Sequence, residues 1–139
     1  MKTIICITLN PAIDKSSSVE YVTAERKLYC QRPQFEPGGG GVNVSRAIQK
    51  LGGTSTLFYP QGGLSGQLLD NLLKEEGINH QSFPINGVIR ENLIILETST
   101  GYQFRFGMPG PEIHEKEWRG CLDEISRIKP KADYIVASG

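Results

Sequence analysis

The chain has 139 residues, of which 38% are hydrophobic and 22% are charged. This length and composition are typical of one globular domain, or of a piece of one, with a core of its own. The 15 basic residues balance the 15 acidic ones, so the net charge is zero at pH 7. The chain therefore has no general attraction for nucleic acid or for an anionic membrane, and any bound anion must be held by local charges.

The cysteines and histidines indicate neither a disulfide framework nor a zinc site. The cysteines are widely spaced and form no CxxC pair: Cys6, Cys30 and Cys121. This spacing favours reduced thiols in a cytosol, and we expect them to be buried and unreactive. His80 and His114 are far apart, and we assign both to the surface. The apolar run at 1–9 is too short for a signal peptide or a membrane span, which favours a cytoplasmic protein.

Strand-like and helix-like segments alternate along most of the chain. The first is a β-branched apolar run typical of a parallel strand that is buried on both faces. The helical segments carry apolar residues at spacings of three and four, and glycines end two of them. In chain order the segments are strand 3–9, helix 42–51, strand 54–59, helix 65–77, helix 118–125 and strand 133–137. The alternation predicts a layered α/β fold with a mainly parallel sheet.

Two stretches, at about 16–35 and about 88–107, interrupt this alternation. Both are typical of exposed strands with two different faces, and in the second Tyr102, Phe104 and Phe106 alternate with polar residues. We expect these stretches to form an antiparallel flap beside the main sheet. Because such a flap is too small to bury its apolar face alone, it must pack against the body or against a second subunit.

The last predicted strand reaches Ala137, two residues before the sequence stops. Ligands of open α/β sheets bind at the carboxyl ends of strands, where the following loop contributes contacts. That loop is absent here. We therefore expect the chain to be a fragment or a shortened product, with part of any active site missing.

A run of four glycines comes directly before the predicted helix at 42–51: Gly38, Gly39, Gly40 and Gly41. Backbone N–H groups and the positive end of the helix dipole can meet an oxygen-rich ligand there without side chains in the way. The run is not a Walker A loop, because no Gly-Lys-Ser/Thr follows, and Val44 stands where the dinucleotide fingerprint needs a third glycine. A flexible turn ahead of a helix is the alternative interpretation.

Two polar residues, Asn43 after the glycine run and Asp14 after the first strand, can bind a sugar. Each can also be explained by a purely structural role. Asn43 can donate to and accept from a sugar hydroxyl, although asparagine near a helix start is commonly a cap. Asp14 can accept two hydrogen bonds from a vicinal diol, although aspartate after Asn-Pro is commonly a turn residue. We expect the first strand and the helix to lie together, so that both side chains open onto one cleft.

Three basic residues fall in the flap. Arg90 stands where an apolar strand begins, and its guanidinium can bind a phosphate through two parallel hydrogen bonds. For Arg105, a solvated charge on the wet face of a strand is an equal alternative. Lys27 stands alone between Arg26 and Leu28, and by itself it indicates a plain surface charge.

Five segments, in order and over nearly all of the chain, resemble the PfkB family of sugar kinases. They are Thr8–Asp14, Pro37–Ala47, Leu51–Gly53, Arg90–Leu93 and Tyr102–Gly110. The resemblance implies a ribokinase-like α/β fold: a layered sheet with helices on both faces and a small antiparallel β lid, incomplete at the carboxyl end. Residues 1–139 are then the amino-terminal part of one domain, with lid strands at about 16–35 and 88–107. The carboxyl-terminal nucleotide-binding part is absent.

The resemblance also implies roles for individual residues. The sugar is held by Asp14, by the glycines Gly38, Gly39, Gly40 and Gly41, and by Asn43. Arg90 and Asn92 help to hold its distal end and phosphate, and Arg105 belongs to the same substrate-binding set. The flap is a lid that forms the contact of a homodimer. Lys27 resembles a lid lysine that reaches the nucleotide bound to the partner subunit.

Gly40 indicates the substrate within the family's sugar-phosphate kinase branch. Fructose-1-phosphate and tagatose-6-phosphate kinases commonly carry lysine at this position of the glycine run, whereas 6-phosphofructokinases of the minor bacterial type carry glycine. The resemblance therefore favours transfer of the ATP γ-phosphoryl, with Mg²⁺, to the 1-hydroxyl of fructose 6-phosphate in glycolysis. Another ketose-phosphate kinase, such as a fructose-1-phosphate or tagatose-6-phosphate kinase, is the alternative within enzymes.

The family's catalytic segment, of the Gly-Ala-Gly-Asp type, does not occur in this sequence. Its aspartate is the base that acts on the attacking hydroxyl, so we expect the base to lie downstream of residue 139. Phosphoryl transfer depends on positioning and charge stabilisation around the metal-bound nucleotide. The 139-residue chain alone is thus expected to show no turnover. A non-catalytic module that binds sugar phosphate or dimerises is the alternative outside enzymes.

Overall fold

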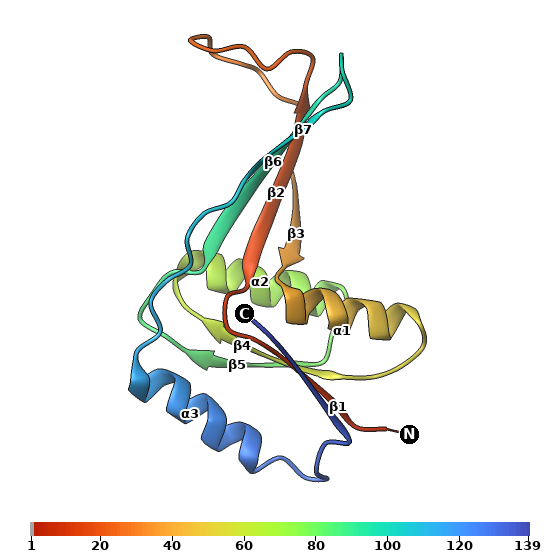
Figure 1. The fold of residues 1–139 in the computed structure, drawn as a ribbon, viewed down its shortest axis with the longest axis vertical. Coiled ribbons are helices and arrows are strands. Elements are labelled where there is room, and N and C mark those ends of the chain that lie inside the picture. The colour runs from red at the N-terminus through yellow and green to blue at the C-terminus, as the bar shows by residue number, and fades with distance from the viewer. Residues whose placement is uncertain (1) are drawn as a thin grey trace.

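The computed structural model describes residues 2–139, which form a body and an upright lid (Figure 1). The body strands are Ile4–Thr8 (β1), Thr56–Gln61 (β4), His80–Pro84 (β5) and Tyr134–Ser138 (β8). The lid strands are Ala12–Val19 (β2), Gln34–Gly38 (β3), Arg90–Glu97 (β6) and Gln103–Phe106 (β7). The body sheet has the order β5-β4-β1-β8, and the lid sheet has the order β3-β2-β6-β7.

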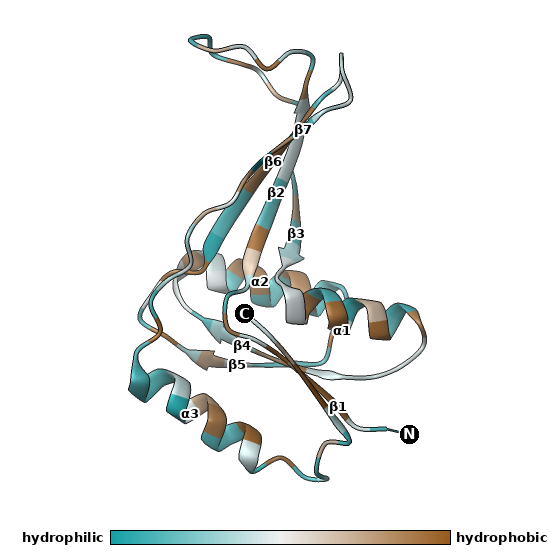
Figure 2. Cartoon of the chain, viewed as in Figure 1, coloured by the Kyte–Doolittle hydropathy of each residue, from teal (hydrophilic) through white to brown (hydrophobic). Residues whose placement is uncertain are grey.

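The body is the layered α/β structure that the sequence predicts. Its strands all pair in parallel. Helices Gly40–Lys50 (α1) and Gly63–Glu75 (α2) lie on one face of the sheet, and Glu115–Ser126 (α3) lies on the other (Figure 1). Parallel strands that are covered on both faces carry continuous apolar runs, and β1 is hydrophobic along its length in Figure 2.

The core of the body lies between the sheet and these helices. It joins Leu57 and Tyr59 of β4 to Leu69 and Leu73 of α2, all of which are fully buried. On the opposite face Cys121 of α3 packs into the same cluster. Burial of these side chains removes apolar surface from water, the main favourable contribution to folding.

Three expectations about secondary structure need correction. The first helix begins at Gly40 rather than at residue 42, so half of the glycine run belongs to the helix. The sequence pattern did not predict β5, because His-Gln-Ser-Phe-Pro contains one strongly apolar residue, Phe83. Residues 20–33, within the stretch expected to be strand, form a loop between β2 and β3.

The lid is mixed rather than antiparallel. Its outer pairs, β2 with β3 and β6 with β7, are antiparallel, as expected for hairpin-like neighbours. The central pair, β2 with β6, is parallel. Both of these strands begin at the body and run outward, so they share a direction although about seventy residues separate them along the chain.

The thiols and histidines follow the expectations only in part. Cys6 and Cys121 are buried, and burial raises the pKa of the Cys121 thiol to about 11, with a smaller contribution from Glu124. Cys30 is exposed in the loop 20–33, so the expectation of burial was wrong for this residue. His114 is exposed at the start of α3, but the side chain of His80 is only 9% exposed.

The side chain of His80 is largely enclosed in a polar cluster between α2 and the body sheet. Its Nε2 atom lies 3.0 Å from Oδ1 of Asp70, and the Tyr59 hydroxyl donates to the same oxygen at 3.1 Å. Lys74 pairs with the other carboxylate oxygen. The bond from Lys74, followed by those from His80 and Tyr59, lowers the pKa of Asp70 below its ordinary value of 3.8 despite partial burial. The carboxylate of Asp70 thus joins α2 to β4 and β5.

Replacing Asp70 by Asn is expected to destabilise the protein by about 1–3 kcal/mol at pH 7, because the buried Tyr59 hydroxyl loses a charged acceptor and Lys74 loses its ion-pair partner. A carboxyl group whose pKa is lower in the folded state stabilises above its unfolded pKa, and this contribution disappears as pH falls through the folded pKa. The difference between Asp70→Asn and wild type should therefore shrink below about pH 4. Urea unfolding at pH 7 and pH 3 measures it, with exposed Asp123→Asn as the control.

Candidate functional site

The candidate site lies where the lid leaves the body. The register of β2 and β6 places Asp14 opposite Asn92. The Asn92 Nδ2 group donates to Asp14 Oδ1 at 3.0 Å, and Asn92 Oδ1 accepts from the backbone N–H of Met108 at 3.0 Å. One amide side chain thus fixes the orientation of the carboxylate and attaches the segment that follows β7. Both side chains are half-buried.

A small pocket of about 70 Å³ opens at this point of the lid. Its lining includes Asp14, Asn92 and Arg105. Arg105 is paired in register with Ile94, two residues beyond Asn92, so the three polar side chains share one face of the lid sheet. The structure therefore brings together three residues that the sequence selected from separate segments.

Gly38 lies directly beside the carboxylate of Asp14. A Cβ atom on Gly38 would lie 2.5 Å from Oδ2 of Asp14 and 2.8 Å from its Cγ, so any other residue there would make the carboxylate move from its present position. Gly39 follows with φ of +115°, a conformation that favours glycine, and it is the N-cap of α1. The glycines are therefore required by the close approach of β3 to β2 and by the turn into the helix.

The amino-terminal end of α1 faces the same region. Gly40 and Gly41 form its first turn, and no side chain caps its first N–H groups. Asn43 is not the cap that one interpretation expected, since Gly39 holds that position and the N–H of Asn43 bonds to its carbonyl at 2.9 Å. The Asn43 side chain is exposed. The helix end thus offers N–H groups and a positive dipole to a ligand.

The terminal nitrogens of Arg90, which we expected to bind a phosphate, are bonded to backbone carbonyls. Its Nη2 atom donates to the carbonyl of Asn10 at 3.2 Å, and its Nη1 atom donates to the carbonyl of Met108 at 3.3 Å. These carbonyls belong to two segments that connect lid and body. The Nε atom is buried without a hydrogen-bond partner within residues 2–139. Arg90 therefore connects the crossing segments, and a phosphate would have to compete with backbone carbonyls for its terminal nitrogens.

Lys27 is not part of this arrangement. It lies in the exposed loop 20–33 at the outer end of the lid (Figure 1), and its ammonium group stands 5.3 Å from the ring centre of Tyr29. The loop is on the far side of the lid strands from the body. Within this chain Lys27 therefore has no contact with the other candidate residues.

The sequence did not predict that backbone groups of Asn10 and Met108 hold the side chains of the candidate site. Both carbonyls accept from Arg90, and the N–H of Met108 binds Asn92. The only signal in the sequence was the position of Met108 before Pro109-Gly110. Main-chain contacts of this kind leave no residue-type pattern, because any residue supplies a carbonyl and an N–H group.

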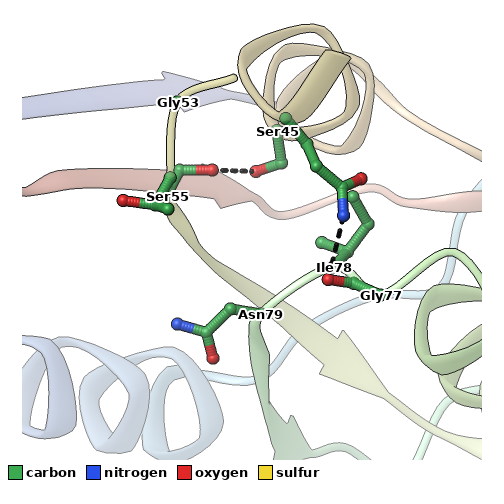
Figure 3. Close-up of a pocket in the computed structure, with 8 residues that line it drawn as sticks. Ser45, Gly53, Ser55, Gly77, Ile78 and Asn79 are labelled. Carbon is green, nitrogen blue, oxygen red and sulfur yellow. Dashed lines mark hydrogen bonds between the residues drawn. The ribbon is translucent and has the colours of Figure 1, made fainter. Parts of the chain in front are cut away.

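A second hollow, of about 90 Å³, lies between α1 and the segments that lead into β4 and β5 (Figure 3). Ser55 donates to the hydroxyl of Ser45 at 3.2 Å, and the Gln49 amide donates to the carbonyl of Gly77 at 3.0 Å. Ser55 and Asn79 directly precede β4 and β5, so the hollow is at the amino ends of the strands. It contains none of the candidate site residues.

The part of the chain that the structure describes contains no cluster of three or more metal-ligating side chains. None of the described helices is both long enough and apolar enough to cross a bilayer.

Replacing Gly38 by Ala is expected to displace the Asp14 carboxylate and break its bond to Asn92, because the new methyl group would lie only 2.5 Å from Oδ2. The side-chain amide resonances of Asn92 should then shift in a ¹H–¹⁵N spectrum. Gly120→Ala is the matched control, since a Cβ atom there meets open space. Alanine in this helical position should instead increase stability, by up to about 1 kcal/mol. Unchanged Asn92 resonances in Gly38→Ala would contradict the prediction.

Curated proteins of known activity match the chain over almost its whole length. It is 42% identical to the ATP-dependent 6-phosphofructokinase isozyme 2 of Mycobacterium tuberculosis over 98% of this chain and 40% of that protein. It is 36% identical to the Escherichia coli protein of the same name, over 99% of this chain and 44% of that protein. A 1-phosphofructokinase of Vibrio cholerae matches at 27% identity. The chain thus spans less than half the length of these relatives.

Solved structures agree with the sequence matches. The E. coli phosphofructokinase-2 in complex with fructose-6-phosphate superposes with a TM-score of 0.93 at 37% identity, covering 100% of this chain and 46% of that one. The pfkB family of carbohydrate kinases matches residues 3–139. The fold is thus ribokinase-like, and the chain belongs to the pfkB carbohydrate kinase family.

Proposed function

We propose that this chain forms the acceptor-binding part and the lid of an ATP-dependent 6-phosphofructokinase. The reaction would convert fructose 6-phosphate to fructose 1,6-bisphosphate. The observation that carries the proposal is the meeting of Asp14, Asn92 and Arg105 in one pocket at the base of the lid. A carboxylate, an amide and a guanidinium together suit a ligand that has both hydroxyl groups and a phosphate.

Each residue has a role that its chemistry supports. Asp14 accepts hydrogen bonds from sugar hydroxyls, and its geometry is fixed by Asn92 and by the space beside Gly38. Arg105 is exposed at the rim of the pocket, where its charge attracts the sugar's phosphate. Arg90 also binds this phosphate once its terminal nitrogens release the carbonyls of Asn10 and Met108. Asn43 and the N–H groups of α1 complete the sugar site.

The choice of fructose 6-phosphate rests on Gly40 and on the relatives. The curated relatives at 36–42% identity are named 6-phosphofructokinase isozyme 2, whereas the 1-phosphofructokinases of Vibrio cholerae and Bacillus subtilis match at 27% and 26%. One matching solved structure is described as a complex with fructose-6-phosphate. A fructose-1-phosphate or tagatose-6-phosphate kinase is the competing assignment. Lysine in place of Gly40 is the feature that would favour it.

We place the ATP and Mg²⁺ sites and the catalytic base outside residues 1–139. Supporting this, the Gly-Ala-Gly-Asp-type segment that the family places around its catalytic base does not occur in these residues. The matched relatives are also more than twice as long. The bound nucleotide and metal supply the phosphoryl group and neutralise its charge, while the residues of this chain bind and orient the acceptor. The chain without the remaining part is expected to be inactive.

We also propose that the protein is a cytoplasmic homodimer whose contact is formed by the lid. In this dimer, Lys27 of one subunit reaches the nucleotide bound to its partner. The lid exposes several aromatic side chains, among them Tyr102 at 70% and Phe106 at 47%. A four-stranded sheet with such a surface is stabilised when a second surface covers it. The exposed position of Lys27 at the outer end of the lid suits a contact with another subunit.

The substrate assignment predicts the order of activities in a coupled assay of ADP release by the full-length protein. Fructose 6-phosphate should give the highest kcat/KM, above fructose 1-phosphate and tagatose 6-phosphate. The isolated 139-residue chain, assayed in parallel, should release no ADP. A preference for fructose 1-phosphate would replace the assignment by the competing one, and turnover by the isolated chain would contradict the placement of the catalytic base.

Replacing Asp14 by Ala should weaken binding of fructose 6-phosphate to the full-length protein by roughly 10- to 100-fold, since a charged acceptor of sugar hydroxyls is lost. Titration calorimetry without nucleotide measures the change in Kd directly. Asp123→Ala, on the exposed side of α3, removes an equal charge away from the pocket and should leave Kd unchanged. Equal affinity of Asp14→Ala and wild type would remove Asp14 from the site.

A further inference from the structure

Arg46 of α1 connects three elements around the glycine run. Its Nε atom donates to Oε2 of Glu76, directly after α2, at 2.7 Å. Its Nη2 atom lies 3.7 Å from Oε1 of Glu36 in β3, and its Nη1 atom lies 3.5 Å from the carbonyl of Pro37. The short bond joins Arg46 to the body, and the two longer contacts reach the last lid strand before the glycines.

The position of these contacts matters because β3 leads directly into the site. Pro37 precedes Gly38, the residue whose missing side chain leaves room for the Asp14 carboxylate. Glu36 is paired in register with Asp14 itself. Any displacement of β3 relative to α1 would therefore change the space around Asp14 and the turn at Gly39.

Arg46 differs from the ordinary surface arginines of the chain. Its side chain is only 20% exposed, and it has partners on both sides of a crossing between lid and body. Exposed ion pairs contribute little, because water and salt screen them. The pair of Arg119 with Glu115 on α3 is of that kind, with both side chains 65% exposed. A planar guanidinium, in contrast, can hold several acceptors in a fixed geometry.

We propose that Arg46 is a positioning residue for the acceptor site. Held by Glu76, its guanidinium sets the place of Glu36 and Pro37 and thereby the geometry of Gly38, Gly39 and Asp14. It does not touch the substrate. This inference rests on the function proposed above, because its effect is read through binding of fructose 6-phosphate.

The test compares variants of the full-length protein by titration calorimetry with fructose 6-phosphate. Arg46→Met should raise Kd about tenfold or more, because small displacements of a binding group are costly. Arg46→Lys should lie between wild type and Arg46→Met, since lysine keeps the charge without the fork. Glu76→Gln, which changes the partner of Arg46 on the body side, should also raise Kd by weakening the anchor of the guanidinium. Arg119→Met is the matched control and should leave Kd unchanged.

Two measurements separate positioning from a merely structural role. A structural role would lower the melting temperature of Arg46→Met while Kd, measured well below that temperature, stays at the wild-type value. A positioning role predicts that Arg46→Met and Asp14→Asn are non-additive in binding, because both act on one carboxylate. An unchanged Kd in Arg46→Met, or strict additivity, would overturn the inference.

The wild-type titration distinguishes this failure from failure of the proposed function. If the wild-type protein does not bind fructose 6-phosphate, the proposed function is wrong and the role of Arg46 falls with it. If the wild type binds and the Arg46 variants bind equally well, the proposed function stands and only the inference is wrong.

Discussion

The parallel pairing of β2 with β6 is the interaction on which the candidate site depends. It places Asp14 beside Asn92 and Ala12 beside Arg90, although 78 residues separate each pair along the chain. Because side chains alternate between the two faces of a strand, a shift of one residue in this register would turn the carboxylate and the amide to opposite faces. Their hydrogen bond and the bond from Asn92 to Met108 stabilise the register in turn.

The candidate site lies at the junction between the packed body and the extended lid. The body is a covered parallel sheet with a continuous core, whereas the lid is joined to it through short crossing segments. Arg90 binds backbone carbonyls in two of these segments, and Arg46 bridges a third. Arginine suits both places, because one guanidinium can donate to several acceptors at once. The base of the lid also shares the core, since Ile13 of β2 is fully buried in the same cluster as the body residues.

Much of the body could be predicted from the sequence, because burial leaves a periodic pattern. The continuous apolar run at residues 3–9 gave β1, and the spacing of Leu69 and Leu73 gave α2. The glycines and Asp14 were likewise selected on residue type and position. The pattern failed at β5, which has too few apolar residues, and at Cys30, whose exposure depends on a loop.

The sequence by itself determined most of the body elements and the glycine turn, and it selected Asp14, Asn92 and Arg105 as candidates for one site. Only the tertiary structure decided that the central lid strands run in parallel and that Arg90 holds backbone carbonyls. It also decided that His80 is buried against Asp70. The reason is physical: periodicity reports how each segment meets water, while strand pairing and ion pairs depend on residues that are distant in the chain and meet only after folding.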